Sequence, residues 1–294
     1  MKKVFIYLQL MRPANIITAV ADILAGIAIT TVFNGTFLQS WSSILLLCVS
    51  TACLYGGGIV FNDVFDADLD KIERPERAIP SGAISIKEAA ILGTVLLSLG
   101  IILAFLTNAN AGLVALAIAF CALVYDQWAK HHHFFGPLNM GLCRGLNLLL
   151  GISIVPAAIN NWYILAIAPV VYIFSITMTS RGEVHGGNKT NLYIAAFLYA
   201  AVIGFIAYFS YTNGRLLWSL VFLLPFAWMI FKPLTKAIAE PIGKNIGLAV
   251  KAGVLSLILM DASWAATFSS LYPALVICCL LPLSIWLSKF FAVT

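Results

Sequence analysis

The stretch FNDVFDADLD, residues 61–70, places four aspartates in a chain that is 62% hydrophobic and only 10% charged. The mean hydropathy of the whole chain is +0.98. A value this high over 294 residues excludes a soluble domain with a single core. Composition therefore predicts a polytopic membrane protein in which this acidic stretch directly follows an apolar segment.

Apolar runs long enough to cross about 30 Å of hydrocarbon recur along the whole chain. They cover residues 14–33, 41–61, 88–106, 111–128, 137–156, 162–180, 191–211, 216–231, 246–268 and 272–290. These runs predict an all-α membrane protein with nine or ten transmembrane helices. The loops between them are short, so one domain over residues 1–294 is expected. The first run lacks a small-residue cleavage site and is expected to stay in the membrane.

The basic residues predict how the chain lies in the membrane. If the N-terminus is cytoplasmic and the helices alternate, every Lys and Arg except Arg215 and Arg144 falls at an inner end or loop. This asymmetry is what the positive-inside rule expects. The acidic stretch should therefore face the cytoplasm, and a bacterial inner membrane is the expected location. The net charge of +5 is explained by membrane orientation, so no nucleic-acid partner is inferred.

The spacing of the acidic stretch predicts a cation-binding face. Asn62, Asp66 and Asp70 are four residues apart and Asp63 lies three before Asp66, so a continuous helix would gather them on one side. Asp68 points elsewhere. Like charges this close need a balancing cation, and hard oxygen ligands without a nearby sulfur or imidazole favour Mg²⁺ over zinc or copper.

The segment KIERPERAIPSG, residues 71–82, follows directly and offers Lys71, Arg74 and Arg77. Mg²⁺ sites are commonly completed by substrate phosphates, and guanidinium groups bind phosphate oxygens in pairs. The combination favours a diphosphate pocket. The alternative is a solvated interfacial loop whose charges neutralise one another. The regular spacing and the glycines at 56–58 favour the pocket, although close helix packing explains the glycines equally well.

These residues resemble the first aspartate-rich motif of the UbiA superfamily of intramembrane prenyltransferases. The matching positions are Asn62, Asp63, Asp66, Asp70, Arg74, Pro75, Arg77, Pro80, Ser81 and Gly82. The segment MRPAN at residues 11–15 and the pair Tyr125 and Lys130 support the resemblance. The predicted helix count and topology also fit, so the resemblance covers essentially the whole chain. The resemblance implies a helical bundle around a central cavity open to lipid. It also implies that Mg²⁺ binds a prenyl diphosphate, whose allylic cation alkylates an aromatic or other lipophilic acceptor.

The resemblance also assigns roles to individual residues. The implied Mg²⁺ ligands are Asn62, Asp63, Asp66, Asp70 and Glu183. The implied substrate-binding residues are Asn62, Arg74, Arg77, Tyr125, Arg144, Arg181, His185 and Lys189. The implied catalytic residues are Asp66, Asp70, Glu183 and Lys130.

The second acidic motif of the family is eroded in this chain. The corresponding stretch is TMTSRGEVHGGNKT, residues 177–190, which has Ser180 at the position of the first aspartate, Glu183 at the second and Gly187 at the third. One carboxylate holds a second Mg²⁺ weakly, so Arg181, Lys189 or a protonated His185 would have to assist diphosphate departure. His185 could also be an acid or base, or only polar surface. The segment RGEVHGG, residues 181–187, resembles that of the divergent EboC-type members of the superfamily.

Three charged residues fall at membrane depth: Asp22, Arg144 and Asp261. Such charges usually pair or face an interior cavity, and Asp22 with Arg144 is the expected pair, with Asn147 on the same face as Arg144. Arg144 either reaches into the pocket or is part of a buried structural ion pair, and the sequence leaves both open. The three histidines at 131–133 point in different directions on a helix and are expected at the surface.

Three functions compete. A Mg²⁺-dependent prenyltransferase explains both the metal ligands and the phosphate-binding residues. A catalytically silent prenyl-diphosphate-binding protein or a lipid carrier would use the same site, and the eroded second motif is its strongest argument, but no inverted repeat typical of transporters is found. A CDP-alcohol phosphotransferase is disfavoured because its D-G-x-x-A-R signature is missing. The acceptor and the prenyl chain length are not specified by the sequence.

Overall fold

The computed structural model describes residues 2–30, 37–182 and 189–291, and every regular element in these ranges is helical. The elements are α1 (Lys2–Met11), α2 (Pro13–Ile29), α3 (Phe37–Phe65), α4 (Ala67–Glu73), α5 (Ile86–Thr107), α6 (Ala109–Gln127), η2 (Ala129–His131), α7 (Phe135–Ile152), α8 (Ala158–Trp162), η3 (Tyr163–Ala166), α9 (Ile167–Ser180), α10 (Lys189–Thr212), α11 (Leu216–Ala239), α12 (Gly243–Phe268), α13 (Leu271–Cys278) and α14 (Leu280–Leu287). Each predicted apolar run coincides with a helix or with a short series of consecutive helices.

Seven or eight of the ten predicted runs meet the length and composition of a membrane span. Within the described ranges, seven helices are long and apolar enough to cross a membrane, and the bent pair α1–α2 makes eight if it is one span. The two other predicted runs form helices that fall outside this count because they are more polar or divided. The helix α7 carries Arg144 and two asparagines, and the run at 271–287 is divided into α13 and α14. The chain is a multi-pass integral membrane protein.

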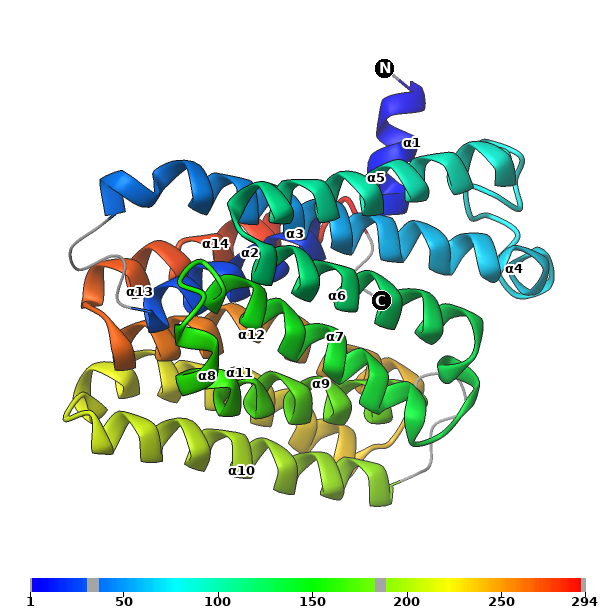
Figure 1. The fold of residues 1–294 in the computed structure, drawn as a ribbon. Helices are drawn as coiled ribbons and strands as arrows, with labels where there is room; N and C mark the ends of the chain where they lie inside the picture. The colour runs from blue at the N-terminus through cyan, green and yellow to red at the C-terminus, as the bar shows by residue number, and fades with distance from the viewer. Residues whose placement is uncertain (1, 31–36, 183–188, 292–294) are drawn as a thin grey trace.

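The long helices lie side by side, and α4 lies at one end of the bundle (Figure 1). The most deeply buried helix is α12. In its most apolar 18-residue window, 72% of the residues are buried inside the bundle. It packs against α11 on one side and α2 on the other. One large apolar cluster unites α2 and α7 with α9 to α12, and a second unites α2 and α7 with α3, α5 and α6. The helices α2 and α7 therefore belong to both halves of the core.

Two helix breaks shape the region that carries the acidic stretch. The chain bends by 50° between α1 and α2 at Arg12, whose φ of 49° is left-handed and which precedes Pro13 at the first turn of α2. The helix α3 ends at Phe65, and α4 begins at Ala67. Backbone bonds continue across the junction, from Asp66 N to Asn62 O at 3.0 Å and from Asp70 N to Asp66 O at 2.8 Å. The predicted single helix through residues 61–70 is thus two helices joined at Asp66.

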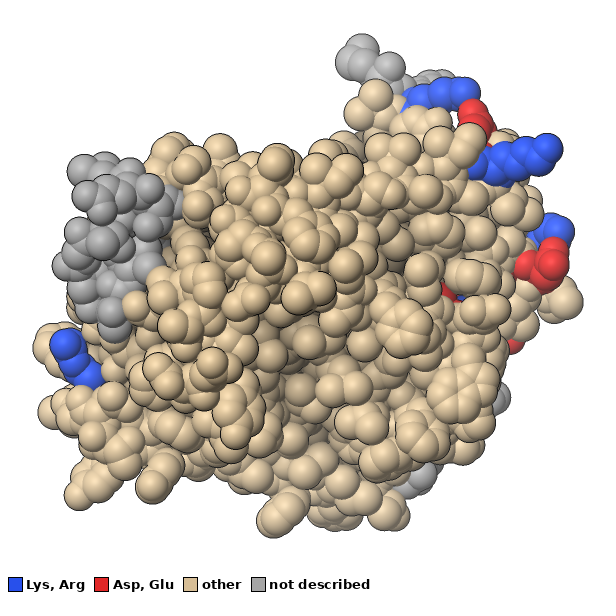
Figure 2. Space-filling model, viewed as in Figure 1, with Lys and Arg blue, Asp and Glu red and all other residues tan. Residues whose placement is uncertain are grey.

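The outer surface agrees with a membrane location. Figure 2 shows a broad face almost free of Lys, Arg, Asp and Glu, with charged side chains gathered at the end of the molecule that carries α4. Large apolar side chains such as Phe197, Leu217 and Trp228 are more than half exposed on the bundle. An apolar exterior of this extent is expected where hydrocarbon is the solvent.

Candidate active site at the end of a central cavity

A cavity of about 450 Å³ lies between α2, α3, α6, α7, α9 and α12. One face of α3 runs along it, because Thr51, Tyr55, Gly58 and Asn62 recur at helical spacing and all line the cavity. Apolar residues of α6, α9 and α12 form much of the remaining wall, among them Ile118, Ile173, Ile176, Val254 and Leu257. The acidic stretch follows where α3 ends, so it lies at one end of this cavity.

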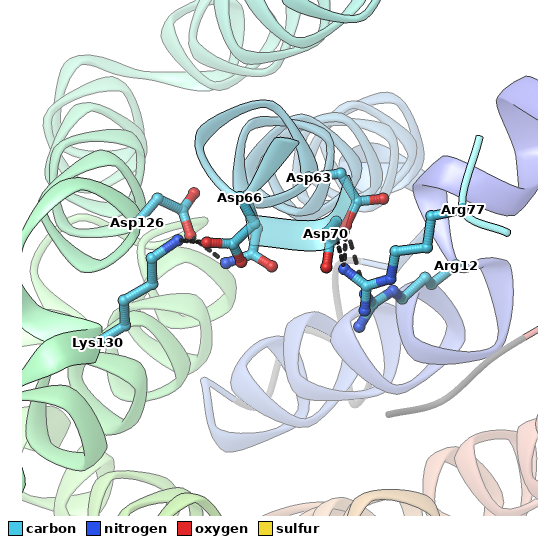
Figure 3. A network of polar contacts seen from close by, with 8 residues as sticks. Arg12, Asp63, Asp66, Asp70, Arg77, Asp126 and Lys130 are labelled. Atoms are coloured by element: carbon cyan, nitrogen blue, oxygen red, sulfur yellow. Dashed lines mark hydrogen bonds and ion pairs between the residues drawn. The ribbon is translucent and has the colours of Figure 1, made fainter. Parts of the chain in front are cut away.

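Two of the predicted aspartates face arginines there. Arg77 Nη1 donates to Asp70 Oδ2 at 2.7 Å and to Asp63 Oδ1 at 3.3 Å. Arg12, at the bend between α1 and α2, lies with its Nη2 3.6 Å from the same Asp63 oxygen. Both carboxylates are largely buried, and both arginines line the cavity. Arg12 and the stretch from Asp63 to Arg77, which are far apart in sequence, thus meet at one acidic and basic cluster (Figure 3).

Asp66 lies on the other side of the same helix end. Its carboxylate accepts a hydrogen bond from Lys130 Nζ of η2, and the adjacent Asn62 Nδ2 donates to Asp126 Oδ1 at 2.8 Å. Figure 3 shows Lys130 and Asp126 on one side of α3 and the two arginines on the other. The break at Asp66 therefore divides the predicted single acidic face into two groups that flank the helix end.

Arg181 holds the segment that carries Lys130. Its Nη2 donates to the backbone oxygen of Lys130 at 3.0 Å and to that of His132, and its Nη1 lies 3.0 Å from His133 Nδ1. The substrate-binding role expected for Arg181 stays a prediction. Its guanidinium lies against the backbone of the η2 segment, where it holds the residue Lys130 in position. The three histidines at 131–133 are exposed, as predicted.

Two further residues of the first motif differ in their surroundings. Asp68 is exposed and accepts a hydrogen bond from Lys71 Nζ at 2.7 Å, which lowers the pKa of Asp68. This confirms that Asp68 points away from the cluster. Arg74 is exposed and lines the cavity. Tyr125 of α6, which is half-buried, also lines the cavity. Both therefore have access to a ligand in the cavity.

The second motif is described only in part. Ser180, which takes the position of the first aspartate, lines the cavity at the C-terminal end of α9. Lys189 is exposed at the first residue of α10. Glu183 and His185 lie outside the described residues, so their assigned roles stay predictions.

A second polar group lies deeper in the bundle. Arg144 Nε of α7 is 2.7 Å from Asp22 Oδ2 of α2, which confirms the predicted ion pair. Asn147 Nδ2 donates to the same Asp22 oxygen at 2.8 Å, and Thr51 Oγ1 donates to Asn147 Oδ1 at 2.6 Å. Arg144 also lines the cavity. The two interpretations of Arg144 are therefore compatible, because it is buried in an ion pair and also reaches the pocket.

Comparison with known proteins identifies the family. The model of the UbiA prenyltransferase family matches residues 23–238. The chain belongs to this family. A similar curated relative of this UbiA-family chain is the digeranylgeranylglyceryl phosphate synthase of Saccharolobus solfataricus, 33% identical over 172 residues. The match covers 58% of this chain and 59% of that relative.

Solved structures share the fold of this UbiA-family chain. A digeranylgeranylglyceryl phosphate synthase superposes with a TM-score of 0.67 at 22% identity, covering 92% of this chain and all of the other. A UbiA homolog from Archaeoglobus fulgidus bound to GPP and Mg²⁺ gives a TM-score of 0.61 at 18% identity, covering 86% of this chain and 99% of the other. These similarities establish the UbiA fold.

Two residues of the UbiA-family cluster were not assigned from sequence. Asp126 is buried beside Asn62, and Arg12 pairs with Asp63 across the cavity end. A signal for Asp126 was present, because it follows Tyr125 and precedes Lys130 by four residues at the end of an apolar run. A signal for Arg12 was its place in MRPAN, directly before the proline that starts a long apolar helix.

Proposed function

We propose that this chain is a Mg²⁺-dependent prenyltransferase that moves a prenyl group from a prenyl diphosphate to a lipophilic acceptor inside the membrane. The observation that carries the proposal is the meeting of Asp63, Asp66 and Asp70 with Arg77 and Lys130 at the end of the cavity. Carboxylates that hold a cation and cations that hold phosphate are both needed to bind a metal diphosphate. The apolar wall beside them suits an isoprenoid chain.

The residues present fit Mg²⁺ by their chemistry. No three His, Cys, Asp or Glu side chains converge on a metal position within residues 2–30, 37–182 and 189–291. Mg²⁺ does not require such a group, because it binds through one or two carboxylates and takes its other ligands from phosphates and water. The candidate ligands are the oxygens of Asn62, Asp63, Asp66 and Asp70, of which one or two carboxylates would hold the ion. The bound ion would neutralise diphosphate charge and so ease the departure of the leaving group.

Binding would exchange the partners of the charged residues. Arg77 and Lys130 now neutralise aspartates, and a diphosphate arriving with its metal would give the cations phosphate oxygens and the carboxylates a metal. The bond between C1 of the prenyl group and the diphosphate oxygen then breaks, and its electron pair leaves with diphosphate. The acceptor forms a bond to C1 and releases its proton to the departed diphosphate.

The apolar wall protects this reaction. An allylic cation reacts rapidly with water, so its survival requires a dry cavity. Ile118 and Ile176 line the cavity together with Val254 and Leu257. These side chains would exclude water from C1 while leaving room for the acceptor.

Three finer assignments are part of the proposal. Geranylgeranyl diphosphate is the first donor to test, because a relative is a digeranylgeranylglyceryl phosphate synthase. The cavity end with α4 is assigned to the cytoplasmic side, because Lys71, Arg74 and Arg77 lie there. The divergence around Ser180 supports assignment of the chain to an EboC-type subgroup.

The test is consumption of radiolabelled geranylgeranyl and farnesyl diphosphates by purified protein in liposomes, with and without Mg²⁺. Lipid extract from the native host supplies the acceptor. A new labelled lipid that requires both protein and Mg²⁺ is expected, and it identifies the acceptor. Intact diphosphate retained without any product would contradict catalysis and support the silent binding protein or carrier instead.

A further inference from the structure

Asp126 is a buried carboxylate at the cavity end that no step of the proposed reaction uses. It lies one residue before the end of α6, lines the cavity and is 3% exposed. A carboxylate is costly to bury unless other groups stabilise it. So little exposed surface also leaves it little direct contact with a ligand. A role for Asp126 must therefore be exerted through the groups that it contacts.

The group that Asp126 contacts is the side-chain amide of Asn62 on α3. Asn62 Nδ2 donates to Asp126 Oδ1 at 2.8 Å. An ionised carboxylate only accepts hydrogen bonds, so it can face the amide nitrogen but not the amide oxygen. Asp126 therefore selects one of the two orientations of this amide. The amide oxygen Oδ1 is turned away from Asp126, and within residues 2–30, 37–182 and 189–291 the structure describes no donor to it.

The orientation matters because only the oxygen of an amide can bind a cation. Mg²⁺ takes oxygen ligands, and an amide N–H that faced the ion would be repelled by it. Asn62 lines the cavity one helical turn before Asp66. The backbone bond from Asp66 N to Asn62 O at 3.0 Å keeps the two residues on one side of the helix end. Asn62 Oδ1 can therefore serve as a further ligand for an ion held by Asp66.

The charges on this side of α3 also favour a cation. The contacts there join the two carboxylates of Asp66 and Asp126 with one ammonium group, that of Lys130, and one uncharged amide. On the other side of the helix end, two carboxylates meet two guanidinium groups (Figure 3). The guanidinium of Arg181 is bound to the backbone oxygens of Lys130 and His132 instead. The side with Asp126 thus has one more carboxylate than cation in contact.

We propose that Asp126 is a positioning residue for the metal diphosphate. It holds Asn62 Nδ2 and thereby presents Asn62 Oδ1 to Mg²⁺, as carboxylates outside a metal site commonly do for the ligands that they contact. This inference rests on the proposed function and adds to it a residue of α6 that acts through a ligand on α3. An oriented ligand strengthens the first metal site in a chain whose second motif has Ser180 in place of an aspartate.

The test measures how much radiolabelled geranylgeranyl diphosphate the purified protein retains in liposomes during a Mg²⁺ titration, so it needs no acceptor and no turnover. Asp126→Asn offers Asn62 both a donor and an acceptor, and should raise the Mg²⁺ concentration for half-maximal retention about tenfold. Asp126→Glu keeps the charge but moves the acceptor by one methylene group, and should raise this midpoint about threefold or more. Asp68→Asn, the same change at an exposed aspartate, should leave it within about twofold.

A second set of variants shows whether Asp126 acts through Asn62. In an Asn62→Ala background the ligand oxygen is missing, so the further change Asp126→Asn or Asp126→Glu should move the midpoint by less than about twofold. Equal rises with and without Asn62→Ala would show that Asp126 acts without Asn62 and would overturn the inference. Thermal unfolding in detergent identifies a variant that fails to fold, and the other substitution of Asp126 then provides the same comparison.

The results for wild type separate this inference from the proposed function. If wild type retains the donor and both Asp126 variants have its midpoint, the positioning role is contradicted while the prenyltransferase proposal stands. If wild type fails to retain geranylgeranyl diphosphate at any Mg²⁺ concentration, the proposed function is contradicted and the inference with it. Retention by wild type is therefore measured first.

Discussion

At the scale of residues, the aspartates at the cavity end each have a partner of opposite charge or a hydrogen-bonding amide. Arg77 bridges Asp63 and Asp70, and Lys130 holds Asp66. Removing one partner from such a cluster leaves the other desolvated and unpaired, which is why the arrangement is stable only when complete. A metal diphosphate brings both signs of charge at once, so it can replace these internal pairs without leaving any group alone.

A substitution of Ser180 tests whether the second acidic motif belongs to the diphosphate site at the end of α3. Ser180 lines the cavity in place of the family's aspartate. Ser180→Asp should lower the Mg²⁺ concentration for half-maximal donor binding about fivefold, because an added carboxylate increases the charge around the cation. The measurement is a Mg²⁺ titration of donor retention. An unchanged midpoint would show that the end of α9 does not approach the metal.

A substitution of Arg181 tests whether this residue acts by positioning Lys130. Arg181 donates to the backbone oxygens of Lys130 and His132. Arg181→Gln should release this segment and raise KM for the donor about tenfold, while kcat at saturation falls less. Arg215→Gln, an exposed arginine at the opposite end of the bundle, is the control. A fall in kcat alone would instead assign Arg181 to the leaving diphosphate.

At the scale of elements, the close crossing of α2 and α7 holds the deep polar group together. A Cβ added to Gly151 would lie 2.4 Å from Ile23 O, and one added to Gly26 would lie 2.5 Å from Leu148 O. Small residues let the two backbones approach this closely. Asp22 and Arg144 lie one to two turns away from these glycines on the same two helices. Their ion pair therefore depends on the crossing.

Gly151→Ala should destabilise the protein by about 1–3 kcal/mol, because the added methyl group meets rigid backbone. Gly204→Ala is the matched control, since nothing lies within 4 Å of a Cβ at that helical position. Thermal unfolding in detergent measures the loss of stability. Equal midpoints for the two variants would contradict the proposed packing.

The sequence predicted helices better than it predicted their breaks. Hydropathy identified every apolar run because burial in lipid depends on composition. Hydropathy missed the junction at Asp66, because a helix interrupted at one residue has the same composition as a continuous helix. It also missed Asp126, whose role depends on Asn62, a partner 64 residues away in the chain. The Asp22–Arg144 pair was predictable because two opposite charges at membrane depth have few other partners.

At the scale of the whole molecule, the bundle is asymmetric in charge. The segment from α4 to the start of α5 carries several basic and acidic residues, whereas the turn between α10 and α11 carries Arg215. Figures 1 and 2 place the charged cluster at the α4 end and a basic side chain at the opposite end. The asymmetry supports an inner position for the cavity end that binds diphosphate.

Cysteine labelling tests this orientation. In a background with the six native cysteines replaced, Glu76→Cys lies beyond α4 and Asn213→Cys lies between α10 and α11. Both positions are exposed. A membrane-impermeant maleimide applied to intact cells should label Asn213→Cys and should label Glu76→Cys only after lysis. The reverse pattern would place the candidate site on the outer side.

The central claim is that the carboxylates at the end of α3 bind a Mg²⁺ diphosphate and enable its reaction. The most direct measurement compares Asp66→Asn with Asp68→Asn, two identical changes two residues apart. Asp66 faces Lys130 beside the cavity, and Asp68 is exposed and faces Lys71. Mg²⁺-dependent turnover of geranylgeranyl diphosphate should fall at least about 100-fold in Asp66→Asn, as for loss of a group that stabilises transition-state charge. It should stay within about twofold of wild type in Asp68→Asn, as for most surface changes. Unchanged turnover in Asp66→Asn, or equal losses in both variants, would contradict the account.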